Sequence, residues 1–271
     1  MKLTVAAIQL KPEKTIDANL RSAEGFLKDC ADAGVQLAVL PENFAHYGQT
    51  DFLQIGRDES DDQGPVRRFL SDQAARHRMW LVAGTIPVAG LNPRPYSRSL
   101  LFNPLGEEVD HYDKIHLFDV DVAAQGQQAA YRESDDFSPG KRVAAVDTDF
   151  VRLGLTVCYD LRFAELYQQL AQADAHIIAV PAAFTAATGQ HHWEVLLRAR
   201  AIENQVFMIG ANLVDRANSK RGLWGGSMIV DPWGTVLASF EDEVGSVIAE
   251  LDTAMIGSVR AKIPVDKHRR L

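Results

Sequence analysis

The sequence has few cysteines, no excess of basic residues and no long apolar run. Only Cys30 and Cys158 occur among 271 residues, so no disulfide framework is indicated and a reducing cytoplasm is the expected setting. Lys and Arg number 28 against 36 Asp and Glu, a formal net charge of -8. This balance argues against nucleic-acid binding, which needs clustered positive charge. No segment has membrane-spanning length, and Gln9, Lys11 and Glu13 interrupt the first apolar stretch too early for a signal peptide.

Several familiar motifs are also absent. The sequence contains no G-x-G-x-x-G after an apolar strand, no P-loop lysine motif, no H-E-x-x-H and no G-x-S-x-G, so nucleotide, zinc-protease and serine-hydrolase functions are not indicated. His191 and His192 are adjacent, and on a helix their side chains diverge by about 100°. They therefore lack the i, i+4 spacing of a helical metal-ligand pair. We expect neither a cofactor nor a metal.

The composition that remains is typical of an α/β protein. Residues are 46% hydrophobic and 24% charged, which is enough to bury one substantial core. Apolar stretches at 3–10 and 35–40 flank a helical pattern at 16–33, which predicts parallel strands joined by a helix. Residues 97–102 and 107–112 predict an antiparallel hairpin. The other predicted elements are strands at 80–86, 151–157, 176–180, 206–211, 226–231, 235–240 and 245–251, and helices at 65–77, 161–172, 190–205 and 252–262.

Three further expectations concern breaks between these elements. Residues 47–63 and 121–141 are predicted to be long polar loops, and loops of such length are often functional or disordered. Pro181 is expected to end the strand at 176–180, because proline halts strand pairing. No fixed repeat or linker divides the sequence, so we predict one domain over residues 1–271.

Three polar residues lie at predicted strand ends, where α/β sheets bind ligands. Cys158 follows the strand at 151–157 and precedes a helix, so the helix dipole would favour its thiolate. A free cysteine is more often a small buried apolar residue. Glu42 and Lys114 also end strands, although a glutamate or lysine at such a position is more often simply a solvated side chain. A papain-type pair, with His116, His191 or His192 as the base of Cys158, is an open alternative.

Taken together, these residues are part of a longer pattern that resembles the nitrilase superfamily of carbon–nitrogen hydrolases, and within it the Nit branch. The resemblance covers nearly the whole chain in order. The segments that carry it are 40–42, 112–119, 132–134, 154–166, 181–184, 192–203 and 231–234. It implies an α-β-β-α sandwich whose copies pair through their helical faces into dimers or larger assemblies.

The resemblance also implies a role for each candidate residue. Cys158 matches the family's nucleophile, Glu42 its general base and Lys114 its catalytic lysine. Glu133 matches a second glutamate that orients the lysine. The backbone N–H of Tyr159 would join Lys114 in binding the oxyanion. Arg162 matches a position that binds a substrate carboxylate, and a structural ion pair is an equally good interpretation of it.

The implied activity is hydrolysis of a primary amide on a small carboxylate-bearing acid through a cysteine thioester, with release of ammonia. Deaminated glutathione is the expected substrate, ahead of α-ketoglutaramate, the substrate of an ω-amidase. An N-carbamoyl hydrolase would use the same residues, and a scaffold that has lost activity is a further alternative. A cytoplasmic homo-oligomer that acts on a small molecule, with no nucleic-acid or membrane partner, is expected.

Overall fold

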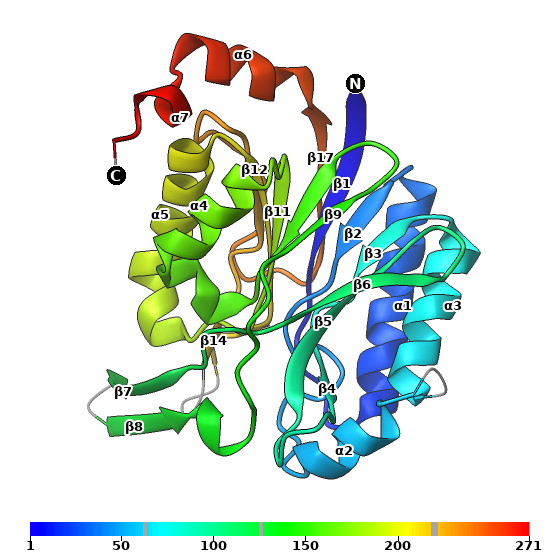
Figure 1. The fold of residues 1–271 in the computed structure, drawn as a ribbon. Coiled ribbons are helices and arrows are strands. Elements are labelled where there is room, and N and C mark those ends of the chain that lie inside the picture. The colour runs from blue at the N-terminus through cyan, green and yellow to red at the C-terminus, as the bar shows by residue number, and fades with distance from the viewer. Residues whose placement is uncertain (62–63, 125–126, 218–221, 271) are drawn as a thin grey trace.

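The computed structural model describes residues 1–61, 64–124, 127–217 and 222–270, and it contains two β-sheets packed face to face between helices (Figure 1). The first sheet has the strand order β17-β1-β2-β3-β5-β4, with β6 paired to β5. Its strands are β1 (Lys2–Gln9), β2 (Leu37–Val39), β3 (Trp80–Val82), β4 (Ile86–Val88), β5 (Tyr96–Phe102), β6 (Glu108–Asp113) and β17 (Gly245–Asp252).

The second sheet has the strand order β16-β15-β12-β11-β10-β9. Its strands are β9 (Ala144–Asp147), β10 (Arg152–Leu155), β11 (Ile177–Ala182), β12 (Phe207–Asn212), β15 (Met228–Val230) and β16 (Val236–Ser239). Two small ribbons lie outside the sheets. They pair β7 (Asp119–Ala124) with β8 (Gln127–Arg132), and β13 (Val214–Asp215) with β14 (Leu223–Trp224).

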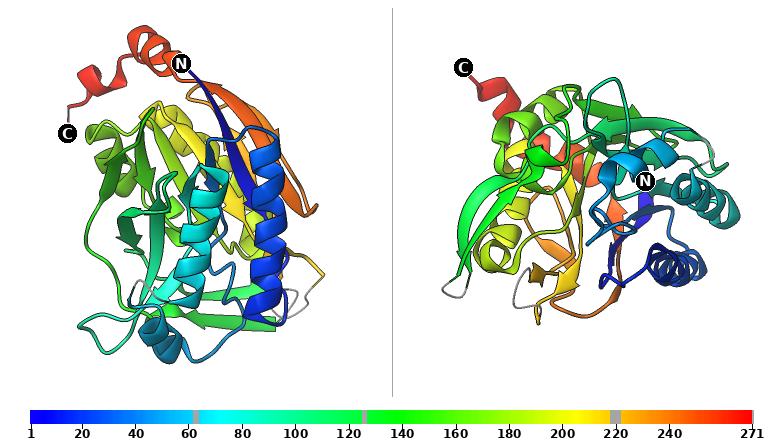
Figure 2. Two further views of the ribbon diagram at one scale, coloured as in Figure 1. Left: turned by 90° about the vertical axis from the view of Figure 1, so that its right-hand side faces the viewer. Right: turned by 90° about the horizontal axis from the view of Figure 1, so that it is seen from below.

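Helices cover the outer face of each sheet and complete four layers. The helices are α1 (Ile16–Asp32), α2 (Phe52–Asp58), α3 (Pro65–His77), α4 (Ala164–Gln172), α5 (Ala186–Asn204), α6 (Ala254–Lys262) and α7 (Val265–His268). α1 and α3 lie over the first sheet, and α4 and α5 over the second (Figures 1 and 2). Among the described residues, no helix combines the length and apolar character needed to cross a membrane. The layer order is the α-β-β-α sandwich that the resemblance implies.

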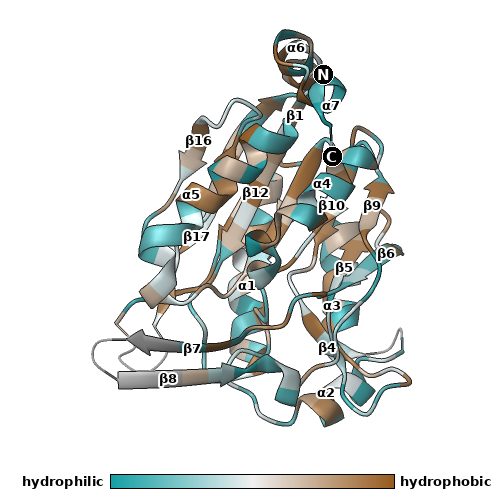
Figure 3. Cartoon of the chain, turned by 60° about the vertical axis from the view of Figure 1, so that its left-hand side comes forward, coloured by the Kyte–Doolittle hydropathy of each residue, from teal (hydrophilic) through white to brown (hydrophobic). Residues whose placement is uncertain are grey.

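Strand β1 shows how the sequence produces this layering. Successive side chains of a strand point to opposite faces. Leu3, Val5 and Ala7 join the core between the two sheets, whereas Ala6 and Ile8 join the core under α1 and α3. Both faces are buried, so β1 is almost continuously apolar instead of alternating. In Figure 3 the apolar colour accordingly follows the inner strands, and the polar colour lies mostly on helices and loops.

Local sequence signals set the bounds of α1. The Thr15 side chain accepts a hydrogen bond from the backbone N–H of Ala18 at 3.2 Å, which caps the first turn. Ala23, Leu27 and Cys30 recur at helical spacing and are buried. Gly34, which follows the helix, has φ +74°, a conformation that glycine adopts without strain. The predicted helix and the parallel pairing of β1 with β2 are confirmed.

Three expectations about local structure were wrong. The predicted loop at 47–63 contains α2, which Asp51 caps through the N–H of Gln54. Most of the predicted loop at 121–141 forms the β7–β8 ribbon and the 3₁₀ helix η1 (Glu133–Asp135), while residues 125–126 lie outside the described residues. Pro181 lies inside β11, because β10 pairs only as far as Ala179 and leaves Pro181 with one neighbouring strand.

Candidate active site

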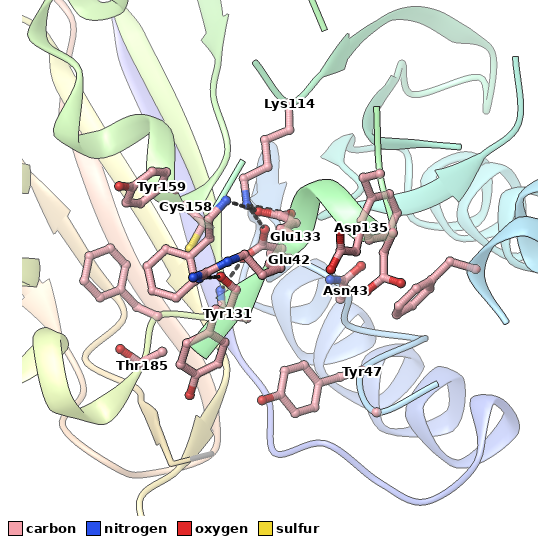
Figure 4. Close-up of a pocket in the computed structure, with 18 of the residues that line it drawn as sticks. Glu42, Asn43, Tyr47, Lys114, Tyr131, Glu133, Asp135, Cys158, Tyr159 and Thr185 are labelled. Carbon is pink, nitrogen blue, oxygen red and sulfur yellow. Dashed lines mark hydrogen bonds and ion pairs between the residues drawn. The ribbon is translucent and has the colours of Figure 1, made fainter. Parts of the chain in front are cut away.

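The polar residues predicted at strand ends meet at one end of the two sheets. β6 is antiparallel to β5, and β5 is antiparallel to β3, so β6 runs in the same direction as β2 and β3. Glu42 and Lys114 therefore follow the same edge of the first sheet. Cys158 and Ala183 follow β10 and β11, which are parallel. These side chains line one pocket, with Glu133 contributed by η1 (Figure 4).

Lys114 lies at the centre of this arrangement. Its Nζ is 2.8 Å from Oε1 of Glu42, and 2.9 and 2.8 Å from the two carboxylate oxygens of Glu133. The lysine side chain is only 2% exposed. Burial disfavours the ammonium, but the charges of Glu133 and Glu42 outweigh it and raise the pKa of Lys114 well above its usual value. Lys114 is therefore a fixed positive charge inside the pocket.

Glu42 is buried and held at both carboxylate oxygens. Oε1 contacts Lys114, and Oε2 accepts a hydrogen bond from the backbone N–H of Ala183 at 2.8 Å. The following residue, Asn43, has a left-handed φ of 52°. Its N–H donates to Oγ1 of buried Thr85 at 2.9 Å. A short, hydrogen-bonded turn thus orients the carboxylate.

Glu133 is held almost as tightly. Besides Lys114, its Oε2 accepts a hydrogen bond from the backbone N–H of Phe118 at 2.6 Å. Burial raises the pKa of Glu133, Lys114 opposes this rise and Glu42 adds to it.

Cys158 begins the 3₁₀ helix η2 (Cys158–Arg162) with φ +45°. Such a backbone is strained for a residue with a side chain, and strain of this kind is common at functional turns. Burial and the charge of Glu42 raise the pKa of the thiol well above its usual value, while Lys114 lowers it. The helix-dipole argument for a thiolate does not apply here, because a short 3₁₀ turn replaces the α-helix N-terminus, and both burial and the charge of Glu42 favour the protonated thiol.

The pocket has a volume of about 590 Å³, within the range of about 300–1,000 Å³ typical of ligand sites. Tyr159 and Arg162 both line it. Its other walls come from the turn after Glu42, from α2, from β8 to η1 and from the start of α5. They include Asn43, Tyr47, Phe52, Tyr131, Asp135, Phe137, Phe184, Thr185 and Thr188. In Figure 4, Tyr159 and Thr185 lie on the opposite side from Asn43, Asp135 and Tyr47.

Arg162 makes no ion pair with a described residue. Its Nη1 donates to Nδ1 of His192 at 3.1 Å, and its guanidinium lies 5.2 Å from the ring centre of Phe184 and 5.7 Å from that of Tyr159. Burial and the Arg162 charge lower the pKa of His192, so its imidazole is neutral and able to accept. The cation thus faces the pocket with its charge uncompensated by a carboxylate.

The three histidines proposed as alternative bases lie elsewhere in the structure. Nδ1 of His116 is 2.7 Å from Oδ1 of Asp160, and the ring stacks on Phe163 at 3.6 Å. His192 contacts Arg162, and His191 is exposed on α5. Within the described part of the chain, no hydrogen bond links Cys158 to a histidine. Nor does any set of three or more His, Cys, Asp or Glu side chains there have a metal-binding arrangement.

Sequence reasoning missed the groups that hold the charged side chains in place. These are the backbone N–H groups of Ala183 and Phe118 and the carboxylate of Asp160. All three residues lie in segments that carried the resemblance, but a backbone donor leaves no residue-type signal, and the partners of Asp160 lie 44 and 48 residues away in the chain. Only the packing of the strand ends reveals them.

Comparisons with known proteins agree with this geometry. The model of the family described as carbon–nitrogen hydrolase matches residues 4–261. A deaminated glutathione amidase from Yersinia enterocolitica is 38% identical over 98% of this chain and 92% of its own length. Omega-amidase NIT2 from Danio rerio is 34% identical over 99% of this chain and 95% of its own.

A solved structure shows the same similarity. Nit3 from Saccharomyces cerevisiae, described as a member of branch 10 of the nitrilase superfamily, superposes with a TM-score of 0.87 at 32% identity. The match covers 100% of this chain and 97% of Nit3. The predicted fold class is therefore confirmed.

Proposed function

This chain belongs to the carbon–nitrogen hydrolase family and is an enzyme of the amidase type, and we propose that it cleaves the amide of a small carboxylate-bearing acid through a thioester on Cys158. The observation that carries the proposal is the buried ammonium of Lys114. It lies between Glu42 and Glu133 and beside the Cys158 thiol, in a pocket large enough for a metabolite. Amide hydrolysis needs such a nucleophile, base and positive charge together.

In the first half-reaction, Glu42 takes the thiol proton and Cys158 attacks the amide carbon. The raised thiol pKa requires this base, because little thiolate exists before substrate binds. The oxyanion that forms is stabilised by Lys114 and by the backbone N–H of Tyr159. Glu42 then gives its proton to the amide nitrogen, the C–N bond breaks and the amine leaves.

In the second half-reaction, Glu42 deprotonates a water molecule that attacks the thioester. The C–S bond breaks, the acid product forms and the proton returns to the thiol. Glu42 can serve both steps because its Oε2 stays anchored on the Ala183 N–H while Oε1 faces the pocket. Glu133 touches Lys114 and the Phe118 N–H, so its proposed role is to hold the ammonium in place.

Deaminated glutathione is the proposed substrate, ahead of α-ketoglutaramate. The relative named for deaminated glutathione is 38% identical, against 34% for the ω-amidase. A pocket of about 590 Å³ also suits the larger molecule. Arg162 lacks a carboxylate partner among the described residues, and its proposed role is to bind the acid group of the acyl part.

The leaving group differs between these substrates. The amide bonds of a glutathione skeleton are secondary, so their hydrolysis releases an amine, whereas α-ketoglutaramate is a primary amide and releases ammonia. The expectation of a primary amide and of ammonia release therefore applies to α-ketoglutaramate and not to deaminated glutathione. A steady-state comparison that measures both products tests the proposal, with Cys158→Ala as the inactive control. Higher kcat/KM for deaminated glutathione is expected. A clear preference for α-ketoglutaramate would reverse the order, and no turnover of either would reject this substrate class.

Two alternatives make different predictions in the same assay. An N-carbamoyl hydrolase would use the same residues on a ureido carbon and release carbon dioxide with ammonia. A non-enzymatic scaffold would turn over nothing. The ion pairs that join Lys114 to Glu42 and Glu133 argue against the scaffold, because burying the charges of Glu42 and Lys114 is costly and serves no binding surface.

We also propose that the whole chain works as one catalytic domain within a cytoplasmic homo-oligomer. Val195 and Ile202 are 65% and 51% exposed on the outer face of α5, and Trp233 in the adjoining turn is 54% exposed. Apolar residues gathered on one face are typical of an interface. Both cysteines are free, which suits a reducing compartment. Light scattering after size exclusion tests the assembly, and a monomeric mass would contradict it.

A further inference from the structure

A buried carboxylate connects the turn that carries Lys114 to the turn that carries the nucleophile. Asp160 is fully buried in η2. Its Oδ1 accepts hydrogen bonds from the backbone N–H of His116 at 3.1 Å and from ring Nδ1 of His116 at 2.7 Å. Its Oδ2 accepts from the Tyr112 hydroxyl at 2.8 Å. Tyr112 and His116 lie two residues before and two residues after Lys114.

The fourth hydrogen bond reaches the nucleophile turn. The backbone N–H of Val157 donates to Oδ2 of Asp160 at 2.9 Å. Val157 immediately precedes Cys158, whose φ is +45°. A carboxylate accepting from the preceding peptide therefore holds the strained backbone in place. No other hydrogen bond from the Val157 N–H occurs among the described residues.

The turn that carries Lys114 is also hydrogen-bonded to Asp160. The Tyr112 hydroxyl also accepts a hydrogen bond from the backbone N–H of Ile115 at 3.3 Å, so one hydroxyl joins that turn to Asp160. The His116 ring lies flat on Phe163, with 3.6 Å between ring centres and 6° between planes. Since a carboxylate only accepts, Nδ1 of His116 carries the proton.

Burying a carboxylate without partners is costly, and four donors offset that cost. Three of the four donors belong to Tyr112 and His116, which are 48 and 44 residues away in the chain. A carboxylate needed only to cap η2 would accept its hydrogen bonds from donors in or next to that helix. The distant donors indicate that Asp160 holds the turn that carries Lys114 in place relative to the turn that carries Cys158.

We propose that Asp160 and His116 are positioning residues that hold Cys158 at its working distance from Lys114. The inference rests on the proposed function, since the geometry they hold is that of the nucleophile and its charged neighbour. Among the described residues that line the pocket, neither Asp160 nor His116 appears. Their loss is therefore expected to lower kcat and to leave KM nearly unchanged.

Two substitutions of His116 separate positioning from direct proton transfer. In His116→Asn, the side-chain N–H₂ occupies the place of Nδ1 and can still donate to Asp160, whereas His116→Leu cannot donate. Neither variant keeps the aromatic stack on Phe163. We expect kcat to fall about 10²-fold in the leucine variant, as for a misplaced reacting group, and to recover by at least about tenfold in the asparagine variant.

A pair of tyrosine variants provides the matched control. Tyr112→Phe removes a hydroxyl that donates to Asp160. Tyr167→Phe removes one from another fully buried tyrosine in the same core, whose hydroxyl bonds Thr156 at 3.1 Å. Tyr112→Phe loses the hydrogen bonds to Asp160 and from the Ile115 N–H, and Tyr167→Phe loses the one to Thr156. A purely structural role therefore predicts losses of kcat that follow the losses of thermal stability. The positioning role predicts a larger loss for Tyr112→Phe at matched thermal stability.

Alkylation of Cys158 tests the inference without any substrate. The pH dependence of its reaction with iodoacetamide reports the thiol pKa, and mass spectrometry separates Cys158 from Cys30. Lys114 lowers the pKa of this thiol, and Glu42 raises it. Loosening the Lys114 turn should therefore shift the profile to higher pH in His116→Leu, but not in Tyr167→Phe. This readout remains informative even if the wild type hydrolyses none of the tested amides.

The outcomes that would overturn the inference are specific. One is equal kcat for the asparagine and leucine variants of His116, which would indicate stacking or proton transfer by the ring. A second is a rise in KM at constant kcat. A third is an alkylation profile that His116→Leu leaves unchanged.

Discussion

At the scale of single residues, the site depends on charges that would be unfavourable alone. The pKa of buried Lys114 is raised because Glu133 and Glu42 surround it, and the pKa of Cys158 is raised by burial and by the charge of Glu42. The residue types and their order were predictable from sequence. Their protonation states were not, because burial and neighbouring charges set them, and both depend on distances that only the folded chain defines.

The base can be identified by substitution. Glu42→Gln keeps an acceptor for the Ala183 N–H but loses the proton-accepting charge. We expect turnover to fall about 10²- to 10⁴-fold, the usual contribution of a general base. His191→Ala, which changes an exposed histidine on α5, should have little effect. Circular dichroism and kcat/KM of both purified variants provide the measurement; a histidine variant as inactive as the glutamine variant would point to a papain-type pair.

The second glutamate can be tested through its partner. Lys114→Ala removes the oxyanion charge and should cost at least about 10²-fold in turnover. Glu133→Gln should cost less, because the ammonium remains but is held less firmly. Residues that act as one unit are non-additive, so the double variant should be little worse than Lys114→Ala. Rate losses that multiply would assign Glu133 a separate role.

At the scale of elements, the strongly periodic segments were predictable and the short ones were not. α1 and α3 match their predicted residues closely, because each has an apolar stripe over several turns. α2 has seven residues and one buried position, Gly56, so it carries no periodic signal. The β7–β8 ribbon and the position of Pro181 inside β11 depend on pairing with other strands. The local sequence carries no information about that pairing.

One glycine at a strand end is expected to be essential, and another is not. Gly84 has φ +58°, and a Cβ there would lie 2.0 Å from the carbonyl oxygen of Pro41, next to Glu42. Gly84→Ala should cost more than about 2 kcal/mol and reduce activity in the remaining folded protein. Gly25, exposed within α1, has open space at its Cβ position. Gly25→Ala should stabilise the protein by about 0.5–1 kcal/mol.

Urea unfolding and kcat measured on the two alanine variants check this prediction. The substitution is the same in both, so the contrast isolates the backbone environment. A Gly84→Ala variant as stable and active as Gly25→Ala would show that the turn before Glu42 tolerates movement.

At the scale of the whole molecule, the site depends on the packing of two sheets. Glu42 and Lys114 come from the first sheet, Cys158 from the second, and Glu133 from the segment that joins them. The order of these residues in the sequence does not indicate how far Cys158 lies from Glu42 and Lys114 in the folded protein. That distance follows from the shared core, in which Val5, Val39 and Leu155 are fully buried. Sequence could thus predict the components of the site, but their assembly follows from sheet packing.

The stability of the whole fold should depend on the protonation of one buried histidine. His46 is buried, and its Nδ1 lacks a hydrogen-bond partner among the described residues. Burial lowers the pKa of His46 to about 4 from its ordinary value of 6.5. Between pH 6.5 and pH 4, His46 therefore binds a proton in the unfolded chain but not in the folded protein. The free energy of unfolding falls as the pH falls through this range. Between pH 7 and pH 5 the protonation of His46 should lower the free energy of unfolding by about 2 kcal/mol.

Urea titrations at the two pH values should show that His46→Gln loses this part of the pH dependence and that His191→Gln, at an exposed position, retains it. Equal pH dependence in the wild type and His46→Gln would mean that His46 is protonated in the folded protein.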